Sequence, residues 1–162
     1  MTELRLRATE PTDLDYVLAA EGDPQARQWV TPWPRERHAA VLTDPDYRHL
    51  VLERDGRLVG WSLLAGVTDT NRCVELKRII VSARGEGVGT RAMRLLVDLA
   101  FDELGAHRLW LDVKHDNHRA RDLYRRLGFV EEGVMRDAFR TESGEYADLV
   151  LMSMLETERP DG

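Results

Sequence analysis

The sequence has few of the features that mark secreted, membrane-embedded or redox proteins. Its single cysteine, Cys73, cannot form an intrachain disulfide, and we interpret it as a packing residue rather than a nucleophile. No apolar run approaches the ~18 residues of a membrane span. Residues 1–7 alternate in charge and contain no apolar signal segment. We therefore expect a cytoplasmic protein with no membrane partner.

An excess of positive charge is also lacking. The formal net charge is −6 and the isoelectric point is near 5.4, which argues against a nucleic-acid partner and is compatible with a cationic one. The 162 residues are 43% hydrophobic and 32% charged, as in an ordinary globular protein. We expect one domain over residues 1–162, in which residues 156–162 form a frayed tail.

Hydrophobic periodicity predicts strands and helices that alternate over much of the chain. Strands are expected at residues 4–8, 49–54, 57–66, 74–81, 108–113, 129–140 and 146–155. Helices are expected at about 13–22, 35–42, 88–104 and 117–127. The helix that joins the strands at 74–81 and 108–113 makes these two strands parallel. The pattern indicates an α+β (mixed α/β) fold.

The segment after the strand at 74–81 is rich in glycine and reads Arg84-Gly85-Glu86-Gly87-Val88-Gly89-Thr90. Alternate glycines leave backbone N–H groups uncovered at the positive end of the following helix, which favours a phosphate ligand. A P-loop would need a lysine before the threonine, and a dinucleotide fingerprint would need G-x-G-x-x-G. The sequence has neither. A tight connection without a ligand is the alternative.

Two motifs together resemble the GCN5-related N-acetyltransferase (GNAT) superfamily. The family's pyrophosphate loop, Gln/Arg-x-x-Gly-x-Gly/Ala, matches residues 84–89. Its downstream pattern of Asn-x-x-Ala-x-x-x-Tyr and then Gly-Phe matches Asn117, Ala120, Tyr124, Gly128 and Phe129. The resemblance spans about residues 4–155 and is strongest to ribosomal-protein N-terminal and polyamine acetyltransferases. It implies a mixed, mostly antiparallel sheet with two splayed parallel strands and helices on both faces.

The resemblance also implies acetyl-CoA as co-substrate and no metal. The pantetheine arm is expected to pair with the backbone of Ile79 and Val81, and Ile80 is a further candidate. The pyrophosphate is expected at Arg84, Gly85, Glu86, Gly87, Val88, Gly89 and Thr90. Asn117 is expected to cap its helix and to hydrogen-bond the pantetheine amide.

Three residues are candidates for catalysis. Tyr124 lies two helical turns after Asn117, on the same face, and is our candidate for the acid that protonates the leaving thiolate. Periodicity alone favours a core aromatic at this position. Glu75 is favoured over Asp112 as the base that deprotonates the acceptor amine. A salt bridge to Lys77 and a solvated strand end are the respective structural alternatives, and a water relay without a dedicated base stays open.

Two tryptophans, Trp29 and Trp33, lie in the loop that borders the acceptor pocket in this family. Aromatic walls suit a cation, a peptide terminus or an apolar drug. The alternative is that both rings fill the core. Because His115 and His118 have no third ligand at suitable spacing, we expect no metal site. The remaining histidines, at 38, 49 and 107, are interpreted as surface or strand-end residues.

These observations predict an acetyl-CoA-dependent enzyme that transfers an acetyl group directly to a primary amine. The acceptor classes are a protein N-terminus, a polyamine, an amino acid or an antibiotic. The alternatives are a non-catalytic acyl-CoA sensor and a transferase that uses another acyl group. The hairpin at 129–155 offers a sheet edge for a homodimer.

Overall fold

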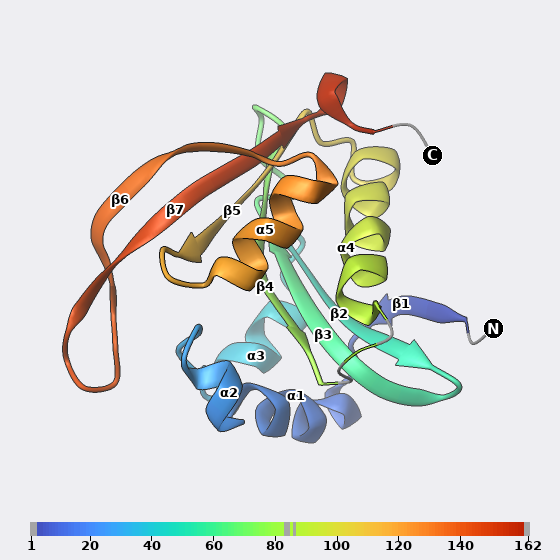
Figure 1. Cartoon of the computed structure of the whole chain (residues 1–162). Helices are drawn as coiled ribbons and strands as arrows, with labels where there is room; N and C mark the ends of the chain where they lie inside the picture. The colour runs from blue at the N-terminus through green and yellow to red at the C-terminus, as the bar shows by residue number, and fades with distance from the viewer. Residues whose placement is uncertain (1–2, 83–84, 86, 161–162) are drawn as a thin grey trace.

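A seven-stranded sheet forms the centre of the computed structural model, which describes residues 3–82, 85 and 87–160 (Figure 1). The strands are β1 (Leu4–Ala8), β2 (Tyr47–Arg54), β3 (Arg57–Ala65), β4 (Cys73–Val81), β5 (Arg108–Lys114), β6 (Val130–Arg140) and β7 (Tyr146–Leu155). Their order in the sheet is β1-β2-β3-β4-β5-β7-β6. Among the described strands, only β4 and β5 pair in parallel, which confirms the mixed, mostly antiparallel sheet.

Helices cover both faces of this sheet. They are α1 (Leu14–Glu21), α2 (Pro24–Arg27), α3 (Arg35–Leu42), α4 (Val88–Asp98) and α5 (His118–Leu127), with short turns η1 (Pro11–Asp13), η2 (Leu99–Glu103) and η3 (Glu156–Glu158). Apolar residues of α1 and α3 pack with Val51, Trp61 and Leu63 on one face, and those of α4 and α5 form a larger core on the other. Within the described ranges, no helix is both long and apolar enough to cross a membrane.

Most predicted elements are confirmed within a few residues, and three segments contain helical turns that the sequence analysis did not specify. The expected helix over 88–104 is α4 followed by one π-helical turn, η2. The four-residue helix α2 lies in a segment for which no element was predicted. Residues 156–160, part of the segment expected to be a frayed tail, begin with η3, and Arg159 forms ion pairs with Asp98 and Asp102 of the α4–η2 segment.

Candidate active site

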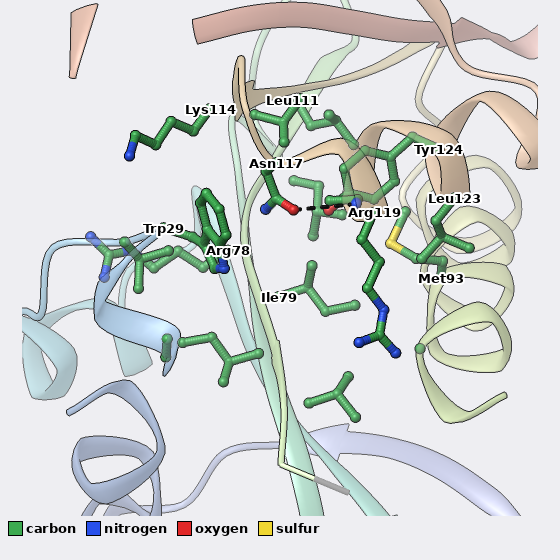
Figure 2. Close-up of a pocket in the computed structure, with 18 of the residues that line it drawn as sticks. Trp29, Arg78, Ile79, Met93, Leu111, Lys114, Asn117, Arg119, Leu123 and Tyr124 are labelled. Carbon is green, nitrogen blue, oxygen red and sulfur yellow. Dashed lines mark hydrogen bonds between the residues drawn. The ribbon is translucent and has the colours of Figure 1, made fainter. Parts of the chain in front are cut away.

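The two parallel strands separate and open a cavity between them. β4 and β5 pair only at Cys73–Arg108, Val74–Leu109 and Glu75–Trp110. Beyond this point β4 continues beside β3, and its other edge faces a cavity of ≈ 720 Å³. Backbone groups on that edge have no neighbouring strand among the described residues, so they are free to hydrogen-bond a ligand. Figure 2 shows Ile79 of β4 beneath the cavity and Tyr124 of α5 above it.

One end of the cavity is formed by glycines at the start of α4. Gly85 and Gly87 have φ angles of 77° and 68°, and no atom lies within 4 Å of where a Cβ would stand on either residue. Gly87 is also the N-cap of α4, so the first N–H groups of the helix face this end. The lining here is Gly85, Gly87, Val88, Gly89 and Thr90. The predicted loop residues Arg84 and Glu86 lie outside the described residues.

The candidate bases, Glu75 and Asp112, stand on opposite strands where the strands separate. Burial raises the pKa of Glu75, Lys77 opposes this shift and the charge of Asp112 adds to it. The Lys77 Nζ lies 3.7 Å from Glu75 Oε1, and only 17% of the Glu75 side chain is exposed. Burial also raises the pKa of Asp112, although its side chain reaches solvent. Both carboxylates line the cavity and hold protons more readily than free acids do.

Tyr124 projects from α5 into the same region. The residue is 9% exposed, and its ring lies 5.9 Å from that of Phe129, centroid to centroid. Burial, with a smaller contribution from Asp112, raises the pKa of Tyr124 to about 12. In the part of the chain that the structure describes, the hydroxyl has no hydrogen-bond partner, and the residue lines the cavity. The phenol is therefore protonated at neutral pH.

The capping role predicted for Asn117 is confirmed. Its Oδ1 accepts a hydrogen bond from the Ala120 N–H at 3.3 Å, drawn as the dashed line in Figure 2. The residue also lines the cavity, together with Ile79, Ile80 and Val81 of β4. Arg119, which the sequence analysis did not single out, reaches from α5 toward α4 and adds a positive charge to the wall (Figure 2).

The two tryptophans have different positions. Trp29 lines the cavity (Figure 2). Trp33 is 6% exposed, belongs to the core under α1 and α3 and is not part of the cavity wall. Its ring packs against Arg37 and Arg78 at 3.8 and 4.8 Å from their guanidinium carbons. Trp33 thus has the position that the core alternative predicts, because apolar residues and two guanidinium groups surround its indole.

A buried polar network behind Trp33 was missed. Glu21 accepts hydrogen bonds from the Trp33 N–H at 2.9 Å, from His38 Nε2 at 2.9 Å and from Arg78 at 2.5 Å. His38 Nδ1 lies 3.1 Å from His49 Nε2. The interpretation of these histidines as surface residues is wrong, because His38 is 0% and His49 is 5% exposed. Their partners are far away in sequence, so no local sequence pattern predicts these hydrogen bonds.

Metal ligands are not concentrated anywhere in the described residues. No group of three or more histidine, cysteine, aspartate or glutamate side chains there could hold an ion. His115 and His118 are exposed beside the start of α5.

The fold and the cavity are those expected of an enzyme that transfers an acyl group from coenzyme A. Sequence comparison supports this class of enzyme. Residues 14–129 match the model of the acetyltransferase (GNAT) family. The chain belongs to this family and is an N-acetyltransferase that transfers an acetyl group from acetyl-CoA to a primary amine.

Relatives with different acceptors are similar to this chain. It is 29% identical to spermidine N(1)-acetyltransferase of Escherichia coli K12, over 94% of this chain and 86% of that protein. It is 30% identical to a putative [ribosomal protein bS18]-alanine N-acetyltransferase of Bacillus subtilis 168, over 96% and 99%. A crystal structure of spermidine N-acetyltransferase from Vibrio cholerae in complex with CoA and spermine superposes with a TM-score of 0.87 at 27% identity, covering 96% of each chain.

Proposed function

We propose that the chain acetylates a polyamine or a protein N-terminal amine, with Tyr124 as general acid and Glu75 as general base. The observation that carries this proposal is the separation of β4 and β5 directly beyond Glu75, opposite Asp112 and beneath Tyr124. An acyl chain that enters between the strands would end where these three groups meet. The pKa values of Glu75 and Asp112 are raised, so both carboxylates take up a proton more readily than free acids do. The Tyr124 phenol is protonated at neutral pH.

The residues on the phosphate side fit a coenzyme A substrate. Gly85 and Gly87 bring bare backbone to the cavity, and the start of α4 presents N–H groups with a positive dipole end. The open edge of β4, including Ile79, Ile80 and Val81, suits the amides of a pantetheine arm. Asn117 has a side-chain N–H₂ left over after its Oδ1 caps α5.

The chemistry needs a neutral amine. A lysine-like or polyamine amine, with a pKa near 10, costs about 4 kcal/mol to deprotonate at pH 7, whereas an α-amine costs about 1.4 kcal/mol. Glu75 would take this proton, directly or through water, as the amine nitrogen attacks the thioester carbonyl carbon. The C–S bond then breaks, and the thiolate receives the Tyr124 proton. The Tyr124 hydroxyl donates a hydrogen bond to the developing thiolate before the transfer, and solvent then restores its proton.

The acceptor classes come from the relatives, which include enzymes named for spermidine and for a ribosomal-protein alanine. Both acceptors present a primary amine at the end of a longer molecule. Of the two tryptophans expected at the acceptor pocket, Trp29 lines the cavity and Trp33 lies in the core.

The test is the release of free thiol from acetyl-CoA with spermidine, N-terminal peptides, amino acids and aminoglycosides as acceptors. We expect turnover with an amine, and a fall in kcat of about 100-fold in Tyr124→Phe with acetyl-CoA affinity retained. Unchanged turnover in Tyr124→Phe would reject this tyrosine as the acid. Acetylation of amino acids or aminoglycosides without acetylation of spermidine or N-terminal peptides would reject the proposed acceptor classes.

A further inference from the structure

Lys114, the last residue of β5, lines the cavity and lies close to two aromatic rings. Its Nζ lies 5.4 Å from the ring centroid of Trp29 and 5.9 Å from that of Phe139, and 14% of its side chain is exposed. Trp29 follows α2 and Phe139 belongs to β6, so three distant segments meet here. All three residues line the cavity, and Figure 2 shows Lys114 directed over Trp29. We call Trp29 and Phe139 the aromatic pair.

An ion pair links the two segments that carry the aromatic pair. Arg27 Nε lies 2.6 Å from Glu142 Oε1, so the last residue of α2 is bound to the turn that follows β6. Both side chains are about half exposed, and the pair therefore contributes little to stability. Arg27 lies two residues before Trp29, and Glu142 three residues after Phe139, so the ion pair joins the two segments close to the rings.

Lysine is scarce in this chain. It has two lysines, Lys77 and Lys114, against 21 arginines, and both lysines line this one cavity. An ammonium is compact, whereas a guanidinium is planar and larger. If the cation at the end of β5 were only a general surface charge, arginine would be the expected residue, as it is at nearly all other basic positions of this chain. The composition thus indicates that a small cation is needed at this position.

The position of Lys114 relative to the carboxylates bears on the acceptor. Asp112 and Lys114 are two residues apart on β5, so their side chains leave the same face about 7 Å apart. A diamine whose reacting nitrogen lay beside Glu75 and Asp112 would bring its second ammonium toward Lys114. Among the described residues, the carboxylate within ion-pair distance of Lys114 is that of Asp116, 3.7 Å away. Its side chain is 48% exposed, so solvent screens much of its charge.

We propose that Lys114 occupies the cation site between Trp29 and Phe139 and thereby selects acceptors with one positive charge, such as a protein N-terminus, against diamines and polyamines. This inference rests on the proposed function and narrows its acceptor class. A second ammonium would be repelled by Lys114 and would find the aromatic pair already filled.

The test compares matched acceptors that differ only in the far amine. Propylamine, butylamine and pentylamine are assayed against the diamines with three, four and five carbons, and kcat/KM is measured by thiol release. We expect the wild-type protein to favour each monoamine. Lys114→Ala, which empties the space between the rings, should raise the ratio of diamine to monoamine kcat/KM by about tenfold. Lys114→Met, which removes the charge but fills the space, should raise it less.

Three further variants separate the cation site from other effects. Lys114→Arg keeps the charge but replaces the compact ammonium with a larger guanidinium, so the ratio should stay closer to the wild-type value than in Lys114→Met. Arg94→Met removes one charge from an exposed position on α4 outside the cavity wall and should also leave the ratio unchanged. Adding Phe139→Leu to Lys114→Ala should cancel much of the gain, because one ring of the aromatic pair is lost. Thermal melts identify any variant that fails to fold.

The outcomes are distinct. If the wild-type protein acetylates monoamines but Lys114→Ala and Lys114→Met both leave the ratio unchanged or lower it, the role of Lys114 is rejected and the proposed function stands. If the wild-type protein already prefers diamines, Lys114 does not exclude them, and the inference fails. If no amine is acetylated, the proposed function fails together with this inference.

Discussion

Two glutamates, Glu21 of α1 and Glu75 of β4, are both shielded from solvent, yet the protein shifts their pKa values in opposite directions. Burial by itself raises the pKa of either carboxyl. At Glu21, hydrogen bonds from His38 and the Trp33 N–H, with the charge of Arg78, overcome burial and lower the pKa. At Glu75, burial exceeds the opposing effect of Lys77, and the pKa is raised.

The difference lies in the number of donors that each carboxylate has. Glu21 has three close donors, whereas the partner of Glu75 is one lysine at 3.7 Å. A carboxylate with three close donors is held ionised, and Glu21 thereby joins α1 to α3 and β4. One with few donors keeps a readily changed protonation state, which proton transfer requires. The comparison separates a structural carboxylate from a chemical one, and the following variants test it.

The largest effect is expected from Glu21→Gln. The amide has nearly the same shape but leaves Arg78 buried without its counter-charge, so the free energy of unfolding should fall by about 4 kcal/mol. Asp15→Asn is the matched control in the same helix, since Asp15 is 88% exposed in its ion pair with Arg35. It should cost less than about 1 kcal/mol. Equal losses in the two variants, measured by urea unfolding, would contradict the structural role of Glu21.

A slightly smaller effect concerns pH and His49, which lies at the far end of the Glu21 network. Burial, with a contribution from His38, lowers the pKa of His49 to about 4. The unfolded chain, with a histidine pKa near 6.5, then binds more protons than the folded one between pH 6.5 and 4. Stability is therefore full above pH 6.5 and falls by about 3 kcal/mol as the pH drops to 4.

His49→Gln should remove this slope. The glutamine can still hydrogen-bond His38 but does not titrate, so the free energy of unfolding should change less between pH 6.5 and 4 than in the wild-type protein. His107→Gln, at a histidine whose side chain is 46% exposed, is the control and should keep the slope. An unchanged slope in His49→Gln would show that other groups account for acid sensitivity. Glu21 itself contributes at lower pH, because its folded pKa lies below that of a free glutamate.

The two glutamates also differ in how well the sequence predicts them. Glu75 lies in a strand rich in β-branched residues that precedes the glycine-rich segment. The local pattern therefore predicts the strand, the face of the strand on which Glu75 lies and its separation from the predicted phosphate-binding residues. Glu21 ends a helix with no motif, and its partners are 12, 17 and 57 residues away. Contacts of this kind depend on the packing of α1, α3 and β4, which no local periodicity encodes.

The same contrast between local patterns and long-range packing applies to the aromatic residues of the cavity and to Asn117. Trp29 and Trp33 share a proline-rich loop, and the sequence does not show that one faces the cavity and the other the core. The aromatic pair around Lys114 joins three segments separated by up to 110 residues, so it too is visible only in the structure. Tyr124 and Asn117 were predictable because one helix carries both, and helical spacing fixes their relation.

Glu75→Gln tests whether Glu75 accepts the proton of the acceptor amine, as its comparison with Glu21 suggests. If Glu75 is the base, it must be ionised to accept the amine proton, so activity falls as the pH drops through its raised pKa. Glu75→Gln should lower kcat/KM by about 100-fold and remove this acid limb of the pH profile. Asp112→Asn is the matched variant on the facing strand. If Asp112→Asn removes the limb and Glu75→Gln keeps it, the base is Asp112.

The smallest effects are opposed shifts of that acid limb. Lys77 lowers the pKa of Glu75 and Asp112 raises it, so the two neighbours act in opposite senses on one carboxyl. Lys77→Met should move the acid limb to higher pH, because Glu75 then loses its nearest cation. If Glu75 is the base, Asp112→Asn should move the limb to lower pH. Profiles of kcat/KM from pH 5 to 9, with one acceptor throughout, would measure both shifts. Shifts of the same sign would mean that the limb belongs to another group, and that Glu75 does not differ from Glu21 in the way its surroundings predict.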